Sequence, residues 1–241
     1  MLPDLEEISI KCYSYLNDSA KYIFQLKKLQ YLDISGCHIE YVWPEFRAYE
    51  LPFYKAIQES QLDTLKVLRA SDCGIMEILI IALLQKAPHL VDLDLSSCRV
   101  GNETLKVISK FLIHLKYLNL ENSSVSDSGL IGKIKLCCTT CEDEYTSKQL
   151  LNIKGLEKLN LSRCAHITEA CVIQAIQFQF LRELYLEGCK ISDRAMLRMY
   201  LNNPCLQKVI HSDFNLKRKY ESKHDKKGKH RSPADKKGRH R

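Results

Sequence analysis

The sequence predicts an α/β solenoid, a horseshoe whose concave face carries short parallel strands and whose convex face carries helices. The first observation is a repeated unit, Leu-x-x-Leu-x-Leu-x-x-Cys, seen most clearly as Leu90, Leu93, Leu95 and Cys98. The second is the spacing of the units, because four of the seven steps between them are 25 residues long. The first position of each unit is occupied by Leu5, Leu29, Leu65, Leu90, Leu115, Leu156, Leu181 and Leu206.

Each unit is predicted to contain one strand followed by one helix. Leucines two residues apart point to the same side of a strand, so the Leu-x-Leu pair faces the core. Polar residues that can cap a helix follow each strand: Asn17 or Asp18, Asn102, Asp127, Thr168 and Asp193. One unit cannot bury its apolar side alone, so successive units stack and share a core.

Cysteine occupies the last position of most units. The chain has 11 cysteines, an odd number. Those in the repeat are Cys37, Cys73, Cys98, Cys164 and Cys189, and Ser123 takes the same position in another unit. We interpret them as reduced, buried thiols that pack in the turn after each strand. A disulfide or redox role is the alternative.

Together with the Ile or Val that follows the cysteine, as in Cys98-Arg-Val100 and Cys189-Lys-Ile191, this pattern resembles the cysteine-containing leucine-rich repeats. Such repeats are typical of F-box/leucine-rich-repeat proteins and of the antagonist-of-mitotic-exit-network family. The resemblance covers roughly residues 2–213 and implies a leucine-rich-repeat domain over 1–214, with about seven to eight repeats. It also implies substrate recognition for an SCF-type ubiquitin ligase.

The sequence departs from that family at its start. The first repeat begins at Leu5, so no F-box precedes it. We expect either a fragment or a relative without an F-box, and a ligase adaptor would be a partner only if an F-box exists outside this chain.

The side chains that alternate with the core leucines should form the concave, partner-binding face. The candidates are Tyr31, Asp33, Arg69, Asp92, Asp94, Tyr117, Glu121, Glu183, Tyr185 and Glu187. Tyrosines favour protein interfaces, and the carboxylates predict an acidic lining that would attract a basic protein target. The alternative is an ordinary solvated sheet face.

Two insertions interrupt the 25-residue spacing, near residues 41–60 and 133–154. The first holds Trp43 and Phe46, either as an exposed binding loop or folded back over the convex side. The second holds Cys137, Cys138 and Cys141, which supply too few ligands for a structural zinc site. We expect no metal and no cofactor.

Residues 215–241 are predicted to form a disordered basic tail. From residue 217 onward there are 12 Lys and Arg against 3 Asp and Glu, while the rest of the chain holds 24 against 26. The basic cluster is Lys226, Lys227, Lys229, Arg231, Lys236, Lys237, Arg239 and Arg241. The tail is interpreted as a nuclear-import or nucleic-acid-binding segment, as a contact to an acidic membrane surface, or as a solubilising extension.

The overall composition excludes several classes of protein. No apolar run approaches the roughly 18 residues of a membrane span, and no catalytic or phosphate-binding motif appears. We therefore expect a soluble protein of the cytoplasm, the nucleus or both, which is not an enzyme. The leading hypothesis is a protein-binding adaptor in ubiquitin-dependent degradation, and the alternative is a nuclear or nucleic-acid-associated scaffold without a ligase role.

Overall fold

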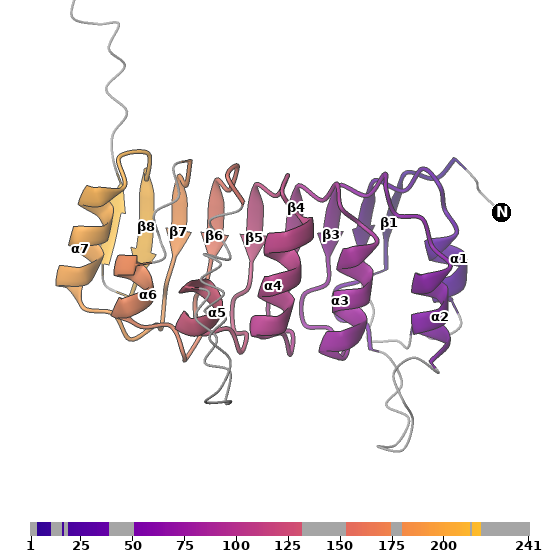
Figure 1. Cartoon of the computed structure of the whole chain (residues 1–241), viewed down its shortest axis with the longest axis horizontal. Helices are drawn as coiled ribbons and strands as arrows, with labels where there is room; N and C mark the ends of the chain where they lie inside the picture. Colours follow the sequence, from indigo (N-terminus) through magenta and orange to yellow (C-terminus); the bar gives the residue numbers. More distant parts are fainter. Residues whose placement is uncertain are drawn as a thin grey trace, which may run out of the picture.

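The computed structural model describes residues 4–10, 16, 19–38, 51–131, 153–174, 180–212 and 214–217. Within them, nine strands form one sheet in the order of the sequence, β1 to β9. Figure 1 shows the helices in a layer along one side of this sheet, and each strand from β1 to β7 is followed by a helix that covers this face. The predicted α/β solenoid is confirmed.

The elements are short and evenly spaced. The strands are β1 (Glu7–Ser9), β2 (Tyr31–Asp33), β3 (Val67–Arg69), β4 (Asp92–Asp94), β5 (Tyr117–Asn119), β6 (Lys158–Asn160), β7 (Glu183–Tyr185), β8 (Lys208–His211) and β9 (Phe214–Lys217). The helices are α1 (Ala20–Phe24), α2 (Pro52–Gln58), α3 (Glu77–Gln85), α4 (Asn102–Phe111), α5 (Asp127–Ile131), α6 (Glu169–Gln174) and α7 (Asp193–Asn202).

The middle residue of each strand builds the core. Strands β1 to β8 are parallel, and their register aligns one apolar row: Ile8, Leu32, Leu68, Leu93, Leu118, Leu159, Leu184 and Val209. Every member from Leu32 to Val209 is at most 1% exposed. Because each fully buried Leu stabilises the fold by about 1.5–3 kcal/mol, this row holds the repeats in register.

The chain makes the same tight turn after most strands. The residue before the cysteine position has a positive φ in six repeats: Gly36, Asp72, Ser97, Asn122, Arg163 and Gly188. A left-handed residue costs little for glycine or asparagine and more for a branched or long side chain. The repeat nevertheless imposes it on Arg163, where φ is 59°.

The repeat cysteines link neighbouring repeats by hydrogen bonds. Each thiol donates a hydrogen bond to a backbone carbonyl of the preceding repeat, with Sγ–O distances of 2.8 Å for Cys98 to Ala70 and 3.1 Å for Cys189 to Leu161. Cys37, Cys73 and Cys164 do the same with Ile10, Ile34 and Leu120. All five are buried free thiols, as expected from their place in the turn.

Several helix starts also accept or donate hydrogen bonds across repeats. Glu77, the first residue of α3, accepts from the backbone N–H of Gly101 at 2.7 Å, just before α4. Asn102 accepts from Ser126 at 3.1 Å, and Asp127 accepts from Thr168 at 2.8 Å. A side chain at the first helical position therefore reaches the next helix of the stack.

Three of the predicted N-caps are wrong by one residue. Asn102, Asp127 and Asp193 are the first residues of their helices, and Ser192 is the N-cap of α7, with its hydroxyl accepting from Ala195. Thr168 does cap α6, because its hydroxyl accepts from the N–H of Ala170 at 3.3 Å. Asn17 and Asp18 lie outside the described residues.

The first predicted insertion is in part a regular element of its repeat. Helix α2 takes up residues 52–58, and Phe53 is buried with its ring 5.4 Å from that of Phe24. Trp43 and Phe46 lie outside the described residues, as do residues 132–152 with the Cys137–Cys141 segment and residues 218–241 with the basic cluster.

The C-terminal end of the sheet differs from the rest. Strand β9 pairs antiparallel with β8 and crosses the predicted domain boundary at residue 214. Among the described residues, no helix has the length and apolar character needed to span a membrane.

Candidate protein-binding surface on the concave face

The strand residues that point away from the core form two rows on the concave face. The first-position row contains Tyr31, Val67, Asp92, Tyr117, Lys158, Glu183 and Lys208, which are register partners. The third-position row contains Asp33, Arg69, Asp94, Asn119, Asn160, Tyr185 and Ile210.

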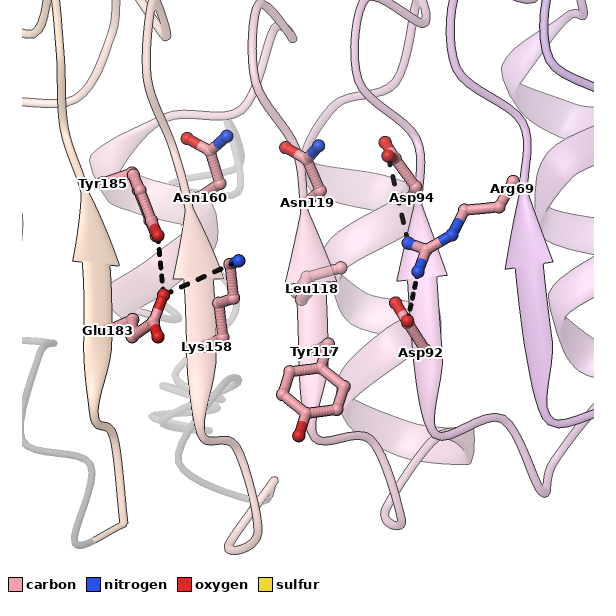
Figure 2. A pocket seen from close by; sticks show the side chains of 10 residues that line it. All are labelled: Arg69, Asp92, Asp94, Tyr117, Leu118, Asn119, Lys158, Asn160, Glu183 and Tyr185. Atoms are coloured by element: carbon pink, nitrogen blue, oxygen red, sulfur yellow. Dashed lines mark hydrogen bonds and ion pairs between the residues drawn. The ribbon is translucent and has the colours of Figure 1, made fainter.

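A hollow of about 500 Å³ lies over the middle of these rows, across β3 to β7. Figure 2 shows its ten lining residues: Arg69, Asp92, Asp94, Tyr117, Leu118, Asn119, Lys158, Asn160, Glu183 and Tyr185. Tyr117, on the middle strand β5, is 39% exposed and is more exposed than Tyr185, the other aromatic residue of the hollow. The hollow is thus a concave surface with an accessible ring among charged groups.

Arg69 and two carboxylates form the end of the hollow at β3 and β4. Its guanidinium contacts Asp92 and lies 4.0 Å from Asp94, and Figure 2 shows it reaching toward both. Burial raises the pKa of the Asp92 carboxyl, and the nearby Arg69 only partly offsets this effect. The end therefore holds two acidic groups and one basic group in a partly desolvated setting.

Lys158, Glu183 and Tyr185 form the other end, at β6 and β7, and Lys208 on β8 contacts Tyr185 beside the hollow. Lys208 Nζ donates to the Tyr185 hydroxyl at 2.8 Å, and that hydroxyl donates to Glu183 at 2.6 Å. Lys158 Nζ lies 3.6 Å from Glu183 and 5.1 Å from the Tyr185 ring. The Tyr185 hydrogen bond lowers the pKa of Glu183, so this carboxylate stays charged at neutral pH.

Much of the third-position row serves the turns. The side chains of Asp33, Asp94, Asn119 and Asn160 each accept a hydrogen bond from the backbone N–H two residues later, at 2.9–3.1 Å. These Asx turns fix the chain direction where the strand ends. A carboxylate or amide at this position is thus partly used in folding.

Asp33 is the clearest departure from the predicted site. It is only 2% exposed, and it contacts the Ser35 N–H and the Ser9 hydroxyl. A carboxylate bound in this way lies inside the structure and is not open to a partner. Our inclusion of Asp33 in the accessible face was therefore wrong.

The predicted residues fall into two groups. Arg69, Asp92, Asp94, Tyr117, Glu183 and Tyr185 meet around the hollow. Tyr31, Glu121 and Glu187 lie outside it; Glu121 contacts Asn160 at 3.2 Å and Arg163 at 3.7 Å.

The expected acidic lining is also corrected by the structure. Arg69 and Lys158 stand among the carboxylates, which makes the surface a mixture of both charges. Lys158 and Lys208 were not among the predicted site residues. The repeat spacing could have pointed to them, because Lys208 lies between Leu206 and Val209 just as Asp92 lies between Leu90 and Leu93.

Comparison with protein-family models agrees with this geometry. Two models described as leucine-rich repeats match the chain, one at residues 86–109 and the other at residues 28–48. The chain is a leucine-rich-repeat protein. Those matched segments contain the strand and core leucines of the β2 and β4 repeats.

Solved structures with a similar fold come from several organisms. An internalin, inlF, from Listeria monocytogenes has a TM-score of 0.54 and 17% identity over 88% of this chain and 48% of its own. A leucine-rich-repeat protein of Leptospira interrogans has a TM-score of 0.49 and 17% identity, over 87% and 49%. A chain of the yeast Rad7 and Elc1 complex has a TM-score of 0.47 and 16% identity, over 86% and 63%.

This leucine-rich-repeat protein spans about half the length of the first two structures. At such identities the similarity establishes the fold and nothing more.

Proposed function

We propose that this leucine-rich-repeat protein binds another protein in the concave hollow and acts as an adaptor rather than as an enzyme. The observation that supports this is the accessible Tyr117 ring set between charged groups on the open face of the sheet. Protein interfaces concentrate their binding energy in a few aromatic and arginine side chains surrounded by polar groups. Tyr117 and Arg69 supply both residue types.

Site-specific photo-crosslinking tests this proposal. A photoreactive amino acid at position 117 should capture a protein in cells, whereas the same group at position 197 should not, because Leu197 lies on α7 with 46% exposure. Equal capture from both positions, or from position 197 alone, would contradict concave binding.

A matched pair of substitutions then measures the energy. Tyr117→Ala should weaken binding of the captured protein more than tenfold, as for an aromatic hot spot. Tyr22→Ala removes an equally large, 56% exposed ring from α1 and should leave binding unchanged. A loss of affinity in Tyr22→Ala but not in Tyr117→Ala would move the binding surface to the helices.

For the class of process, we infer that the adaptor presents its partner for ubiquitin-dependent degradation. This inference is supported by the resemblance of the repeats to those of F-box/leucine-rich-repeat proteins. Affinity purification of the full chain should then recover cullin-type ligase subunits, and depletion of the chain should lengthen the half-life of the protein captured at position 117. If neither effect is observed in cells that contain the crosslinked complex, the degradation role is excluded and partner binding is retained.

The second candidate function, a nuclear or nucleic-acid-associated scaffold, rests on the separation of charge along the sequence. The basic excess of the chain lies beyond residue 217, whereas the rest has slightly more acidic than basic groups. Deleting residues 218–241 keeps β9 intact and should abolish nuclear accumulation or salt-sensitive RNA binding. Unchanged localisation and RNA binding would reject it.

A further inference from the structure

The two ends of the hollow carry opposite local excesses of charge. At β3 and β4, Asp92 and Asp94 share Arg69, which is the only basic side chain within ion-pair distance of either one in the described part of the chain. At β6 to β8, Lys158 pairs with Glu183, and Lys208, beside the hollow, adds a second ammonium group that donates to the Tyr185 hydroxyl. One end thus has a carboxylate in excess, and the other end has an ammonium group in excess.

We propose that the hollow binds a protein segment with a basic side chain directed at Asp92 and Asp94 and an acidic side chain directed at Lys158 and Lys208. Such a segment neutralises both local excesses when it displaces water from the hollow. This inference rests on the proposed function, and it specifies the chemistry of the partner and its orientation across the sheet.

The register sets the spacing of the two charges. Asp92, Tyr117 and Lys158 are consecutive register partners on β4, β5 and β6. Neighbouring strands are about 4.8 Å apart, so the two charged ends begin about 10 Å apart. That separation matches residues three apart in a polyproline II segment, which rises about 9 Å over one turn. It also matches residues seven apart on a helix.

The environment of Asp92 favours a cation in the partner. Its side chain is partly buried, and burial outweighs Arg69 in its effect on the pKa of Asp92. A bound partner would exclude more water from the Asp92 carboxylate. The partner must therefore supply a positive charge, in addition to that of Arg69, to offset the cost of this desolvation. Tyr117 stands beside Asp92, and its ring offers a surface on which the basic side chain can stack.

Selection from a display library of random linear peptides tests the inference on the full chain. Enriched peptides should contain Lys or Arg and Asp or Glu at a fixed separation. The variant Asp92→Asn with Asp94→Asn should abolish enrichment of the basic residue alone. It should fold normally, because Asn119 and Asn160 form the same Asx turn in other repeats. Lys158→Gln with Lys208→Gln should abolish enrichment of the acidic residue alone.

The affinities of one selected peptide provide the second measurement. Each double variant should weaken its binding about fivefold, the effect of a partly exposed charge pair. Lys106→Gln, on α4, should have no effect and serves as the charge control.

Two negative outcomes can be distinguished. Peptides that depend on Tyr117 but show no charge preference would overturn this inference and keep the proposed binding function. If no peptide is enriched, or if enriched peptides are insensitive to Tyr117→Ala, this inference is overturned, and crosslinking at position 117 decides separately whether the proposed function fails as well.

Discussion

Glu77 should stabilise the repeat that follows its own. Its Oε1 atom accepts from the Gly101 N–H at 2.7 Å, the Thr104 N–H at 3.2 Å and the Thr104 hydroxyl at 2.8 Å. Helix α4 has no capping side chain of its own, because its N-cap is Gly101. Loss of a helix cap costs about 1 kcal/mol, and loss of a negative charge at a helix start costs about 0.3–1 kcal/mol. Glu77→Ala should therefore lower the free energy of unfolding by about 2 kcal/mol.

Denaturation and hydrogen exchange together locate this effect. Chemical denaturation followed by circular dichroism gives the change in stability, and Glu77→Gln, which keeps an acceptor oxygen, should lose only about 0.5 kcal/mol. The amides of Gly101 and Thr104 should exchange more than tenfold faster in Glu77→Ala.

The matched control is Glu103→Ala, which removes from the first turn of α4 an exposed carboxylate that pairs, within the described part of the chain, with Lys106 alone. Because it removes a charge from the helix start but no capping hydrogen bond, it should lower the free energy of unfolding by at most about 1 kcal/mol, half the loss expected for Glu77→Ala. If the Glu77 and Glu103 variants lose equal stability, capping between repeats is not what Glu77 contributes.

Three other predictions follow from the thiols and from the hollow. Cys98→Ala should lower the free energy of unfolding by about 1 kcal/mol, since the hydrogen bond from its thiol to the preceding repeat is lost; an unchanged denaturation midpoint would contradict this. Iodoacetamide should modify the exposed Cys205 much faster than Cys189, whose pKa burial raises to about 11, and equal rates by mass spectrometry would refute the burial. Tyr185→Phe should raise the lowered pKa of Glu183, because the hydrogen bond from the Tyr185 hydroxyl is lost. The variant should therefore be less stable than wild type above about pH 4.5, and this difference should disappear as the pH falls through the pKa of folded Glu183. A difference that stays constant with pH would exclude this cause.

The sequence predicted the strands well because their register is strongly constrained. A slip of one residue would turn Leu93 to the concave face and Asp92 or Asp94 into the core. The alternation of leucine and polar residues therefore specifies both the strand and its facing. The same argument placed Tyr117 and Tyr185 correctly on the outward side.

Contacts between repeats were not predictable by the same means. The candidate caps were chosen by residue type next to the helix that they start, but Asn102 binds Ser126, 24 residues away. The positive φ of Arg163 was equally hidden, because the residue type gives no indication of it and only the shared turn of the stack imposes it. Local sequence patterns carry no information on such non-local partners.

For the hollow, the sequence specified position but not pairing. Alternation shows which side chains point outward, but it does not show which of them pair across neighbouring repeats. Arg69 lies on the strand before Asp92, and Lys158 lies 25 residues before Glu183, so each pair forms only when two repeats stack. Asp33 was placed on the outer face in the same way, although its contacts with Ser35 and Ser9 draw it into the structure.

The two rows of outward-facing residues differ in how strongly folding constrains them, and this difference explains which side chains are available to bind a partner. In the third-position row, Asp94, Asn119 and Asn160 hold the turns, so their side chains are constrained by folding. Arg69 and Tyr185 take the same position in repeats without such an Asx turn, and their longer side chains reach the groups at the two ends of the hollow instead. The first-position row carries no turn, which leaves Tyr117 and its charged neighbours free to vary with the partner. Relatives that bind a different partner should therefore differ first in the first-position row and at the positions of Arg69 and Tyr185. They should differ last at Asp94, Asn119 and Asn160, which hold the turns.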